Sequence, residues 1–470
     1  MILTQYYTGC LSQAAYLIGD EQSRRAVIVD PLRDIEQYVT DAANRGLSIV
    51  GVILTHFHAD FVAGHLELAA ATGAWIALGD RARPEFDARL LGDGERIVLG
   101  DPSSGGADGV VVEVMTTPGH TPESISLLVF EHGSDSAPAG VLTGDALFVG
   151  DVGRVDLQAS FGADPAQLAV MQHDTIQRKL MGLPDDVEVW PAHGAGSACG
   201  RSIGLERSST IGAERRDNPA CRPMAVDEFV DYLTAGQAVP PAYFEEDAGL
   251  NRRRHPLFTA AAARRRLSLD ELDAHLAAGG VVLDARHQDE FALGHLPGSL
   301  GVPLVGRFAE TAGMFLDLGA PIVIVVSEPG TEVEAVSRLG RIGADSVVGI
   351  VDGVGVGALA AAGRLVPSLR ASADEVDRMR DSAPAPFIID VRSAVEYESG
   401  SVPGAMNIPL PQLARRIGEV PGDRPVVVYC QSGWRSSVAG SWLRGHGVPA
   451  IELAGGMDAW QRHLNDAVPA

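Results

Sequence analysis

The chain has 470 residues, which is too long for one hydrophobic core and predicts about three domains. Hydrophobic residues make up 46% of the sequence, as in a soluble protein, and no apolar run is long enough to cross a membrane. The formal net charge of -24 argues against a nucleic-acid or anionic-membrane partner, because both require a basic surface.

The cysteine content predicts a reducing, cytoplasmic setting. The 4 cysteines are too sparse for a disulfide framework and form no Cys-x-x-Cys pair; they are Cys10, Cys199, Cys221 and Cys430. In such a setting a cysteine is either a small buried side chain or a chemical group. The N-terminal residues lack a basic segment followed by an apolar stretch, so no signal peptide is expected.

Ligand-type side chains follow a predicted buried strand at residues 49–54. His56, His58 and Asp60 alternate directly behind this apolar run. Neutral imidazole nitrogen and carboxylate oxygen are ready ligands for a divalent cation. The pattern therefore predicts a metal platform at the end of the strand.

Further candidates recur behind later apolar runs. His120 lies in a Thr-Pro-Gly-His sequence, Asp145 closely follows a predicted strand at 141–143, and His193 lies in Trp-Pro-Ala-His-Gly. Residues 1–200 alternate short Val/Ile/Leu-rich runs with helical stretches. This alternation predicts an α/β sandwich whose site lies at the strand ends.

The set and order of these residues resemble the metallo-β-lactamase superfamily over about the first 200 residues. The resemblance implies an αββα sandwich. Two-metal hydrolases of this superfamily place a His directly after the motif Asp, but Phe61 stands there in this chain and cannot ligate. His65 is one helical turn away and cannot simply replace it. A single metal is therefore expected, and by resemblance its ligands are His56, His120 and Asp145.

Two imidazoles and one carboxylate with open positions form the facial triad of non-haem Fe(II) oxygenases, so the expected cofactor is one mononuclear Fe(II). His58, Asp60 and His193 are then expected behind the ligands, where they would orient them or a bound water.

The segment 144–156 resembles the persulfide dioxygenases, which oxidise a thiol persulfide with O2, give sulfite and release the thiol. The implied substrates are low-molecular-weight thiol persulfides of the glutathione or coenzyme A type. Arg154 is expected either to clamp a substrate carboxylate or phosphate, or to pair with Asp156. Cys199, six residues past His193, is a candidate sulfur relay at the metal pocket, and its alternative is a quiet structural thiol.

Residues 201–265 are rich in Pro, Arg and polar residues and predict a connector with some helix around 224–235. We expect the metal domain with its C-terminal extension to span residues 1–245 and a linker to span 246–266.

An internal repeat occupies residues 267–470. Asp284 and Arg286 recur as Asp390 and Arg392, with matching turns and apolar runs around them. A period of roughly a hundred residues indicates two homologous domains, here 267–366 and 367–470. Each copy alternates strands and helices, which predicts a small α/β domain on a parallel sheet.

The C-terminal copy carries a cysteine loop. A predicted strand delivers Cys430 into a short loop that opens a helix, where converging backbone N–H groups stabilise an anionic or persulfidated sulfur. The loop resembles the rhodanese family of sulfurtransferases over residues about 370–465. The resemblance implies catalysis by Cys430 and Arg435, with substrate contacts from the loop residues Gln431, Ser432, Gly433 and Trp434.

The middle copy lacks the catalytic residues of this loop. Val326-Ser327-Glu328-Pro329-Gly330 stands where the loop should be, without the Cys or the Arg. Ser327 is expected to be structural, because no base that could activate it is evident. This copy is therefore expected to be an inactive rhodanese domain.

The combination predicts a bifunctional sulfide-detoxification enzyme, both a persulfide dioxygenase and a thiosulfate sulfurtransferase. The iron domain would produce sulfite, and Cys430 would transfer sulfane sulfur, to sulfite or between thiol carriers. One alternative is a dinuclear zinc thioester hydrolase of the glyoxalase II type, which predicts two metals and no O2 uptake. Another is a non-catalytic sulfur carrier or persulfide sensor. A homo-oligomer is expected.

Overall fold

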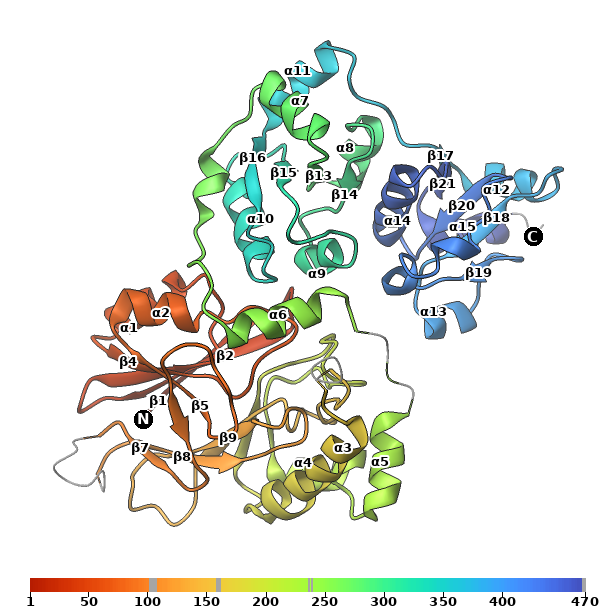
Figure 1. The fold of residues 1–470 in the computed structure, drawn as a ribbon. Helices are drawn as coiled ribbons and strands as arrows, with labels where there is room; N and C mark the ends of the chain where they lie inside the picture. Colours follow the sequence, from red (N-terminus) through yellow and green to blue (C-terminus); the bar gives the residue numbers. More distant parts are fainter. Residues whose placement is uncertain (101–107, 158–161, 236, 238–239, 467–470) are drawn as a thin grey trace. The chain divides into compact units, whose positions relative to one another are not determined.

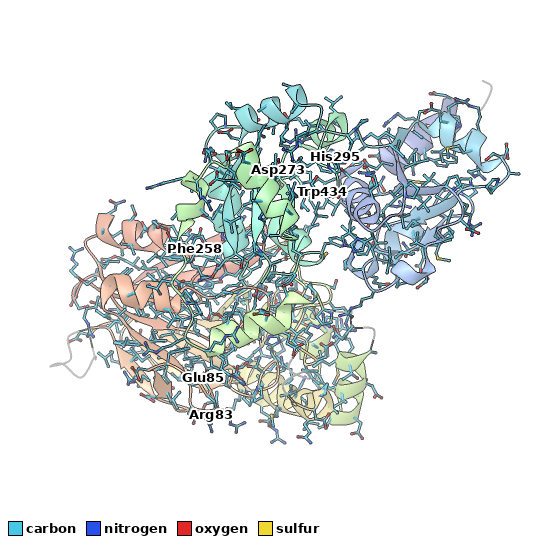
Figure 2. The ribbon with its side chains drawn as sticks, turned by 45° about the horizontal axis from the view of Figure 1, so that its top comes forward. Arg83, Glu85, Phe258, Asp273, His295 and Trp434 are labelled. Carbon is cyan, nitrogen blue, oxygen red and sulfur yellow. The ribbon has the colours of Figure 1, made fainter. Side chains whose placement is uncertain are left out.

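The computed structural model describes residues 1–100, 108–157, 162–235, 237 and 240–466. The chain divides into two compact units. The first comprises Met1–Phe258 together with Gly340–Gly343, and the second comprises Thr259–Leu339 and Ala344–Ala470. Phe258, the last residue of the first long segment, is labelled in Figure 2.

The first unit contains two sheets that are drawn in red to yellow in Figure 1. One has the strand order β1-β2-β3-β4-β5-β6, with bounds Ile2–Thr8, Gln13–Asp20, Arg25–Val29, Ser48–Ile53, Trp75–Gly79 and Arg89–Leu91. The other has the order β12-β11-β10-β9-β8-β7. Its strands in chain order from β7 are Arg96–Val98, Val111–Thr116, Ile125–Phe130, Gly140–Gly144, Glu188–Pro191 and Ser209–Thr210.

Three apolar layers hold this unit together. Side chains such as Val27 and Ile53 of the first sheet meet Val112 and Leu127 of the second in the central layer. The outer layers are completed by helices α1 and α2 on the first sheet and by α3 and α5 on the second. The bounds of α1 to α5 are Glu36–Asn44, His65–Thr72, Pro165–Asp174, Ile211–Asp217 and Val226–Thr234. The αββα sandwich expected from the sequence is confirmed.

Helix α6 (Tyr243–Arg252) belongs to the first unit, although the sequence placed the start of a linker at residue 246. The buried Asn251 accepts a hydrogen bond from the Ala63 N–H at 2.7 Å and donates to the carbonyls of His58 and Phe61 at 2.8 and 2.7 Å. These contacts satisfy the backbone of the His-x-His-x-Asp loop. The predicted boundary therefore shifts from residue 245 to Phe258.

The second unit holds two further sheets with parallel neighbours. The order β14-β13-β15-β16 is built from Val281–Asp284, Leu300–Gly301, Ile322–Val325 and Val347–Val351, given from β13 to β16. The order β17-β21-β20-β18-β19 is built from Arg370–Ala371, Phe387–Asp390, Met406–Asn407, Val426–Tyr429 and Ala450–Leu453, given from β17 to β21. Parallel sheets in both copies confirm the predicted α/β repeat.

Helices follow the strands of both copies. In the middle copy α7 to α11 span Leu269–Ala277, Gln288–Leu293, Phe308–Gly313, Thr331–Gly340 and Gly353–Ala361. In the C-terminal copy α12 to α15 span Ala373–Arg380, Ala394–Glu398, Trp434–Gly445 and Gly456–Asp466. Among the described residues, no helix has both the length and the apolar character needed to cross a membrane.

Candidate functional site

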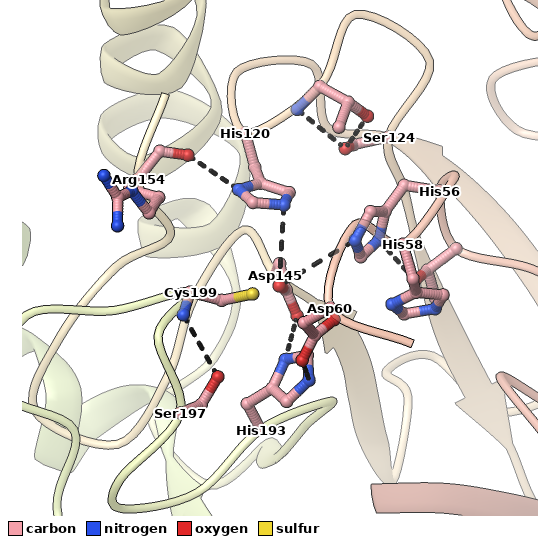
Figure 3. A network of polar contacts seen from close by, with 12 residues as sticks. His56, His58, Asp60, His120, Ser124, Asp145, Arg154, His193, Ser197 and Cys199 are labelled. Atoms are coloured by element: carbon pink, nitrogen blue, oxygen red, sulfur yellow. Dashed lines mark hydrogen bonds and ion pairs between the residues drawn. The ribbon is translucent and has the colours of Figure 1, made fainter. Parts of the chain in front are cut away.

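A cluster of three buried ligand-type side chains lies at the strand ends of the first unit (Figure 3). The Asp145 Oδ2 atom lies 3.8 Å from His56 Nε2 and 3.5 Å from His120 Nε2. All three side chains are at most 2% exposed, and one ligand atom from each lies within 4.8 Å of the others. The structure thus brings together the triad predicted from the sequence.

The cluster fits a cation, because its inward atoms lack protein partners. His56 Nε2 and Asp145 Oδ2 are buried and have no hydrogen-bond partner among the described residues. On the outer side, His120 Nδ1 lies 2.6 Å from the Arg154 carbonyl and donates to it, which leaves the Nε2 lone pair facing the cluster. His56 Nδ1 contacts the Thr55 hydroxyl at 3.0 Å in the same manner.

The protonation states also suit a metal. Burial, reinforced by the neighbouring His58, holds the pKa of His56 well below its usual range. Burial alone would raise the pKa of Asp145, but His193 and His56 together hold that pKa well below its usual value. A neutral imidazole and an ionised carboxylate are the forms that ligate metals.

His58 lies behind His56, as expected. Its Nε2 atom is 3.0 Å from Asp30 Oδ1, and its ring centroid is 4.3 Å from that of Phe61. Asp30 also accepts hydrogen bonds from the Thr55 N–H and hydroxyl, both at 2.8 Å. Sequence reasoning missed Asp30, whose only signal is its place directly after the apolar run that became β3.

His193 bridges two carboxylates. Its Nδ1 atom lies 2.8 Å from Asp145 Oδ1, and its Nε2 atom lies 2.8 Å from Asp60 Oδ2. Burial disfavours the charged imidazolium, yet Asp145 and Asp60 together raise the pKa of His193 well above its usual range. His193 therefore stands behind the triad and holds the second oxygen of Asp145, while Asp60 holds the other ring nitrogen of His193.

A second group of ligand-type atoms lies beside the first and consists of Asp60, His193 and Cys199. One atom from each lies within 4.8 Å of the others, and all three side chains are buried. Burial and then the Asp60 carboxylate raise the pKa of the Cys199 thiol well above its usual range. Phe61 stands where two-metal hydrolases have a His ligand for the second ion. The Gly-rich turn after His193 instead brings the Cys199 sulfur close to Asp60 and His193.

Arg154 is engaged within the protein. Its Nε and Nη2 atoms donate to the two oxygens of Asp156, each at 2.7 Å, and its Nη1 atom donates to the Ala198 carbonyl at 3.2 Å. The side chain is 2% exposed. Of the two expectations for Arg154, the structure shows the pairing with Asp156, and a contact with substrate remains a prediction.

The cysteine loop of the C-terminal copy surrounds its sulfur with donors. Cys430 directly follows β20 and is 1% exposed. The Gly433 N–H donates to the sulfur at 3.2 Å, and the Ser436 hydroxyl lies 3.5 Å from it. Gly433 has a φ of 114°, which other residues rarely adopt, and α14 begins at the next residue. The loop geometry matches the arrangement predicted from the sequence.

Arg435 is anchored at the edge of this loop. Its Nη1 and Nη2 atoms donate to the two oxygens of Glu396 at 2.7 and 2.6 Å. The hydrogen bonds from Arg435 lower the pKa of Glu396 to about 2. Glu396 was not predicted as a site residue, although it stands three residues after the helix cap Ser393 in the repeated motif.

Gln431 connects the loop to neighbouring residues, and its expected contact with substrate remains a prediction. Its Oε1 atom accepts a hydrogen bond from Arg392 at 3.1 Å, and its Nε2 atom donates to Asp458 at 2.5 Å. Ser432 is exposed. Trp434, labelled in Figure 2, is half-buried, and its indole N–H has no partner in the described part of the chain. For Ser432 and Trp434 a contact with substrate remains a prediction.

Comparisons with known proteins agree with this division of the chain. Residues 8–193 match the model of the metallo-beta-lactamase superfamily, and residues 268–353 and 372–463 match that of the rhodanese-like domain. A solved structure described as a metallo-beta-lactamase from Staphylococcus aureus is 29% identical, with a TM-score of 0.65, and the match covers 75% of this chain and 98% of that one.

Three curated relatives cover parts of the chain. Human mitochondrial persulfide dioxygenase ETHE1 is 27% identical over 237 residues, which is 50% of this chain and 80% of the relative. A hydroxyacylglutathione hydrolase from Synechococcus is 31% identical over 185 residues, 38% of this chain and 63% of the relative. A sulfurtransferase from Allochromatium vinosum is 39% identical over 78 residues, 16% of this chain and 73% of the relative.

The family models, the sandwich with its buried triad and the repeated parallel sheets lead to one assignment. The chain contains a metallo-beta-lactamase domain at residues 8–193, followed by two rhodanese-like domains at residues 268–353 and 372–463.

Proposed function

We propose that the chain is a bifunctional sulfur enzyme. Its first domain would oxidise a low-molecular-weight thiol persulfide with O2, and its last domain would transfer sulfane sulfur through Cys430. The buried triad of His56, His120 and Asp145 carries the first assignment, in a domain similar to a persulfide dioxygenase. The donor-lined sulfur of Cys430 carries the second.

We assign one Fe(II) to the triad. When bound, the iron would bring persulfide and O2 together and activate O2. Overall, persulfide, O2 and water would give thiol and sulfurous acid, with four electrons passing from the outer sulfur to O2. The protein's part is to keep His56 neutral and to orient both His56 and His120 through their Nδ1 atoms. His193 holds the remaining oxygen of Asp145, so that the carboxylate keeps one orientation.

The sulfur transfer would run through a cysteine persulfide. The Cys430 sulfur attacks the outer sulfur of a donor, the S–S bond of the donor breaks, and the donor leaves as a thiolate. Negative charge on the bound sulfur would be stabilised by the Gly433 N–H, which already points at Cys430, and by the Ser436 hydroxyl, which lies 3.5 Å from the sulfur and can turn to it from the Gly433 carbonyl at 3.1 Å. Transfer to sulfite would give thiosulfate and regenerate Cys430.

Other parts of the chain fit this account. The middle copy lacks both the Cys and the Arg of the loop, so we assign it no sulfur transfer. Cys199 lies beside the triad, but its raised pKa opposes a relay role, because the thiolate is the nucleophilic form. Four free cysteines suit a reducing compartment such as the cytoplasm. We expect glutathione- or coenzyme A-type persulfides as substrates.

Oxygen uptake with glutathione persulfide tests the first activity. The protein should consume O2 and release sulfite, and the His120→Ala variant should lose the uptake. Cys430→Ser is the matched control and should keep it. Uptake that survives in His120→Ala would contradict the assignment of the triad.

A dinuclear zinc hydrolase acting on a thioester is the second candidate. The group of Asp60, His193 and Cys199 favours it, because these side chains offer ligand-type atoms for a second ion. The similarity to a hydroxyacylglutathione hydrolase points the same way. Elemental analysis of anaerobically purified protein separates the two candidates: about one iron per chain supports the dioxygenase, and two zinc ions support the hydrolase.

A further inference from the structure

The middle rhodanese-like domain contains an open pocket of about 350 Å³ at the place of its lost cysteine loop. Arg286, Glu290 and Ser327 supply polar groups to the lining, and its apolar part includes Leu293, Val356 and Leu365. Ser327 stands two residues after β15, just as Gln431 stands two residues after β20 in the C-terminal copy. The pocket therefore corresponds to the neighbourhood of Cys430.

In the C-terminal copy, loop residues of the protein occupy both the arginine and the glutamate of this neighbourhood. The Arg392 Nη1 atom donates to the Gln431 side chain at 3.1 Å. Glu396 receives two hydrogen bonds from Arg435. The guanidinium and the carboxylate are thus both occupied.

In the middle copy, the Nη1 atom of the corresponding arginine lacks the hydrogen bond to a loop side chain, and the corresponding glutamate lacks the arginine partner. Arg286 still uses its Nε and Nη2 atoms on Asp284, but no hydrogen bond of its Nη1 atom is found within the described ranges. Ser327 replaces the longer Gln431 and donates instead to Glu290 at 2.8 Å. No arginine in the described part of the chain pairs with Glu290, which is exposed.

We propose that this pocket binds a small zwitterion of the amino-acid or short-peptide class. The ligand carboxylate would meet the Arg286 Nη1 atom, which lines the pocket. The ligand ammonium would meet Glu290, and its hydrocarbon part would cover the apolar wall. A simple anion is disfavoured because Glu290 repels it. The pocket volume lies in the range of small-molecule sites.

The link to metabolism rests on the proposed function. Glutathione carries an ammonium and carboxylates on a short peptide, so the pocket would keep a thiol carrier on the chain between the two reactions. Binding itself requires neither activity.

Calorimetric titration of the full chain with S-methylglutathione tests the proposal, because this thioether cannot accept sulfur as a thiol would. We expect saturable binding that persists in both His120→Ala and Cys430→Ser. Glu290→Gln should weaken it about tenfold or more, since one charge-assisted hydrogen bond is lost. Ser327→Gln should weaken it similarly, because the new carboxamide would take Arg286 Nη1 as Gln431 takes Arg392.

Asp270→Asn is the matched control, because it removes one exposed carboxylate from α7 of the same domain, away from the pocket lining. It should leave the affinity unchanged. Absence of saturable binding would overturn the proposal, as would binding that Glu290→Gln and Ser327→Gln both leave intact. Failure of the proposed function is a separate result: it would appear as missing O2 uptake with binding preserved.

Discussion

The two rhodanese-like domains share one buried frame, in which an arginine donates hydrogen bonds to an aspartate and to a glycine carbonyl. In the middle copy Arg286 donates to Asp284 at 2.6 Å and to the Gly294 carbonyl at 2.8 Å. In the C-terminal copy the equivalent hydrogen bonds from Arg392 reach Asp390 at 2.7 Å and the Gly400 carbonyl at 2.6 Å. Both aspartates are at most 1% exposed. The frame persists in both copies because a buried charge must stay paired.

The loops differ where the frames agree. The C-terminal loop places two donors on the sulfur of Cys430, whereas Val326 occupies the matching position of the middle copy. The middle copy thus keeps the fold although it lacks the Cys and Arg of the loop, because packing and chemistry depend on different residues. The shared Asp-Arg motif therefore identifies the fold, and the loop alone indicates activity.

The largest expected effect concerns the loop. Cys430→Ser should reduce sulfur transfer from thiosulfate to cyanide by at least about a thousandfold, because the hydroxyl is a far weaker nucleophile. The matched change in the other copy, Ser327→Ala, should leave the rate unchanged. A comparable loss in Ser327→Ala would break the distinction between an active and an inactive copy.

The frame should matter equally in both copies. Asp390→Asn and Asp284→Asn should each destabilise their own domain by about 3 kcal/mol, because each leaves a buried arginine without its partner. Hydrogen exchange followed by mass spectrometry would localise the loss. Asp374→Asn, which breaks an exposed pair with Arg378, should cost no more than about 0.5 kcal/mol.

Acid should affect the C-terminal loop through Glu396. The pKa of this carboxyl is lowered from its ordinary value of 4.5 to about 2 by hydrogen bonds from Arg435. A depressed folded-state pKa gives stability that is present above about pH 4.5 and is lost as the pH falls towards about 2. Glu396→Gln should remove this pH dependence in thermal unfolding of the C-terminal domain.

Glu290→Gln is the control for this acid effect, since Glu290 contacts Ser327 and no arginine among the described residues. Identical acid profiles for wild type and Glu396→Gln would show that the Arg435 pair contributes nothing in solution.

The smallest expected effect concerns Gln431. Gln431→Ser installs the residue of the middle copy and removes the contacts with Arg392 and Asp458. Loss of these contacts should destabilise the ordered loop by about 1 kcal/mol. This should lower kcat of sulfur transfer several-fold and leave KM nearly unchanged. An increase in KM alone would instead indicate that Gln431 contacts the substrate.

Sequence reasoning succeeded where the signal is local. Apolar runs mark the buried strands, and side chains behind such runs meet at one edge of the sandwich, which indicated a metal platform. The choice of His56, His120 and Asp145 as ligands was implied by the resemblance to the metallo-β-lactamase superfamily. The cysteine loop was likewise readable because its strand, turn glycine and helix start are contiguous in sequence.

The missed features depend on partners distant in sequence. Asn251 satisfies the backbone of the metal loop from about 190 residues away, and no local pattern announces that contact. The position of Cys199 at the metal pocket was anticipated from the sequence, but its grouping with Asp60 was not. The protein partners of Gln431 are likewise distant in sequence, since Arg392 and Asp458 lie 39 and 27 residues away.

The most direct test of the account is to measure sulfite and thiosulfate together after reaction with glutathione persulfide and O2. The wild-type protein should form both, Cys430→Ser should form sulfite without enzymatic thiosulfate, and His120→Ala should form neither. If Cys430→Ser loses sulfite as well, the two activities are not separable, and the assignment of one chemistry to each domain is contradicted.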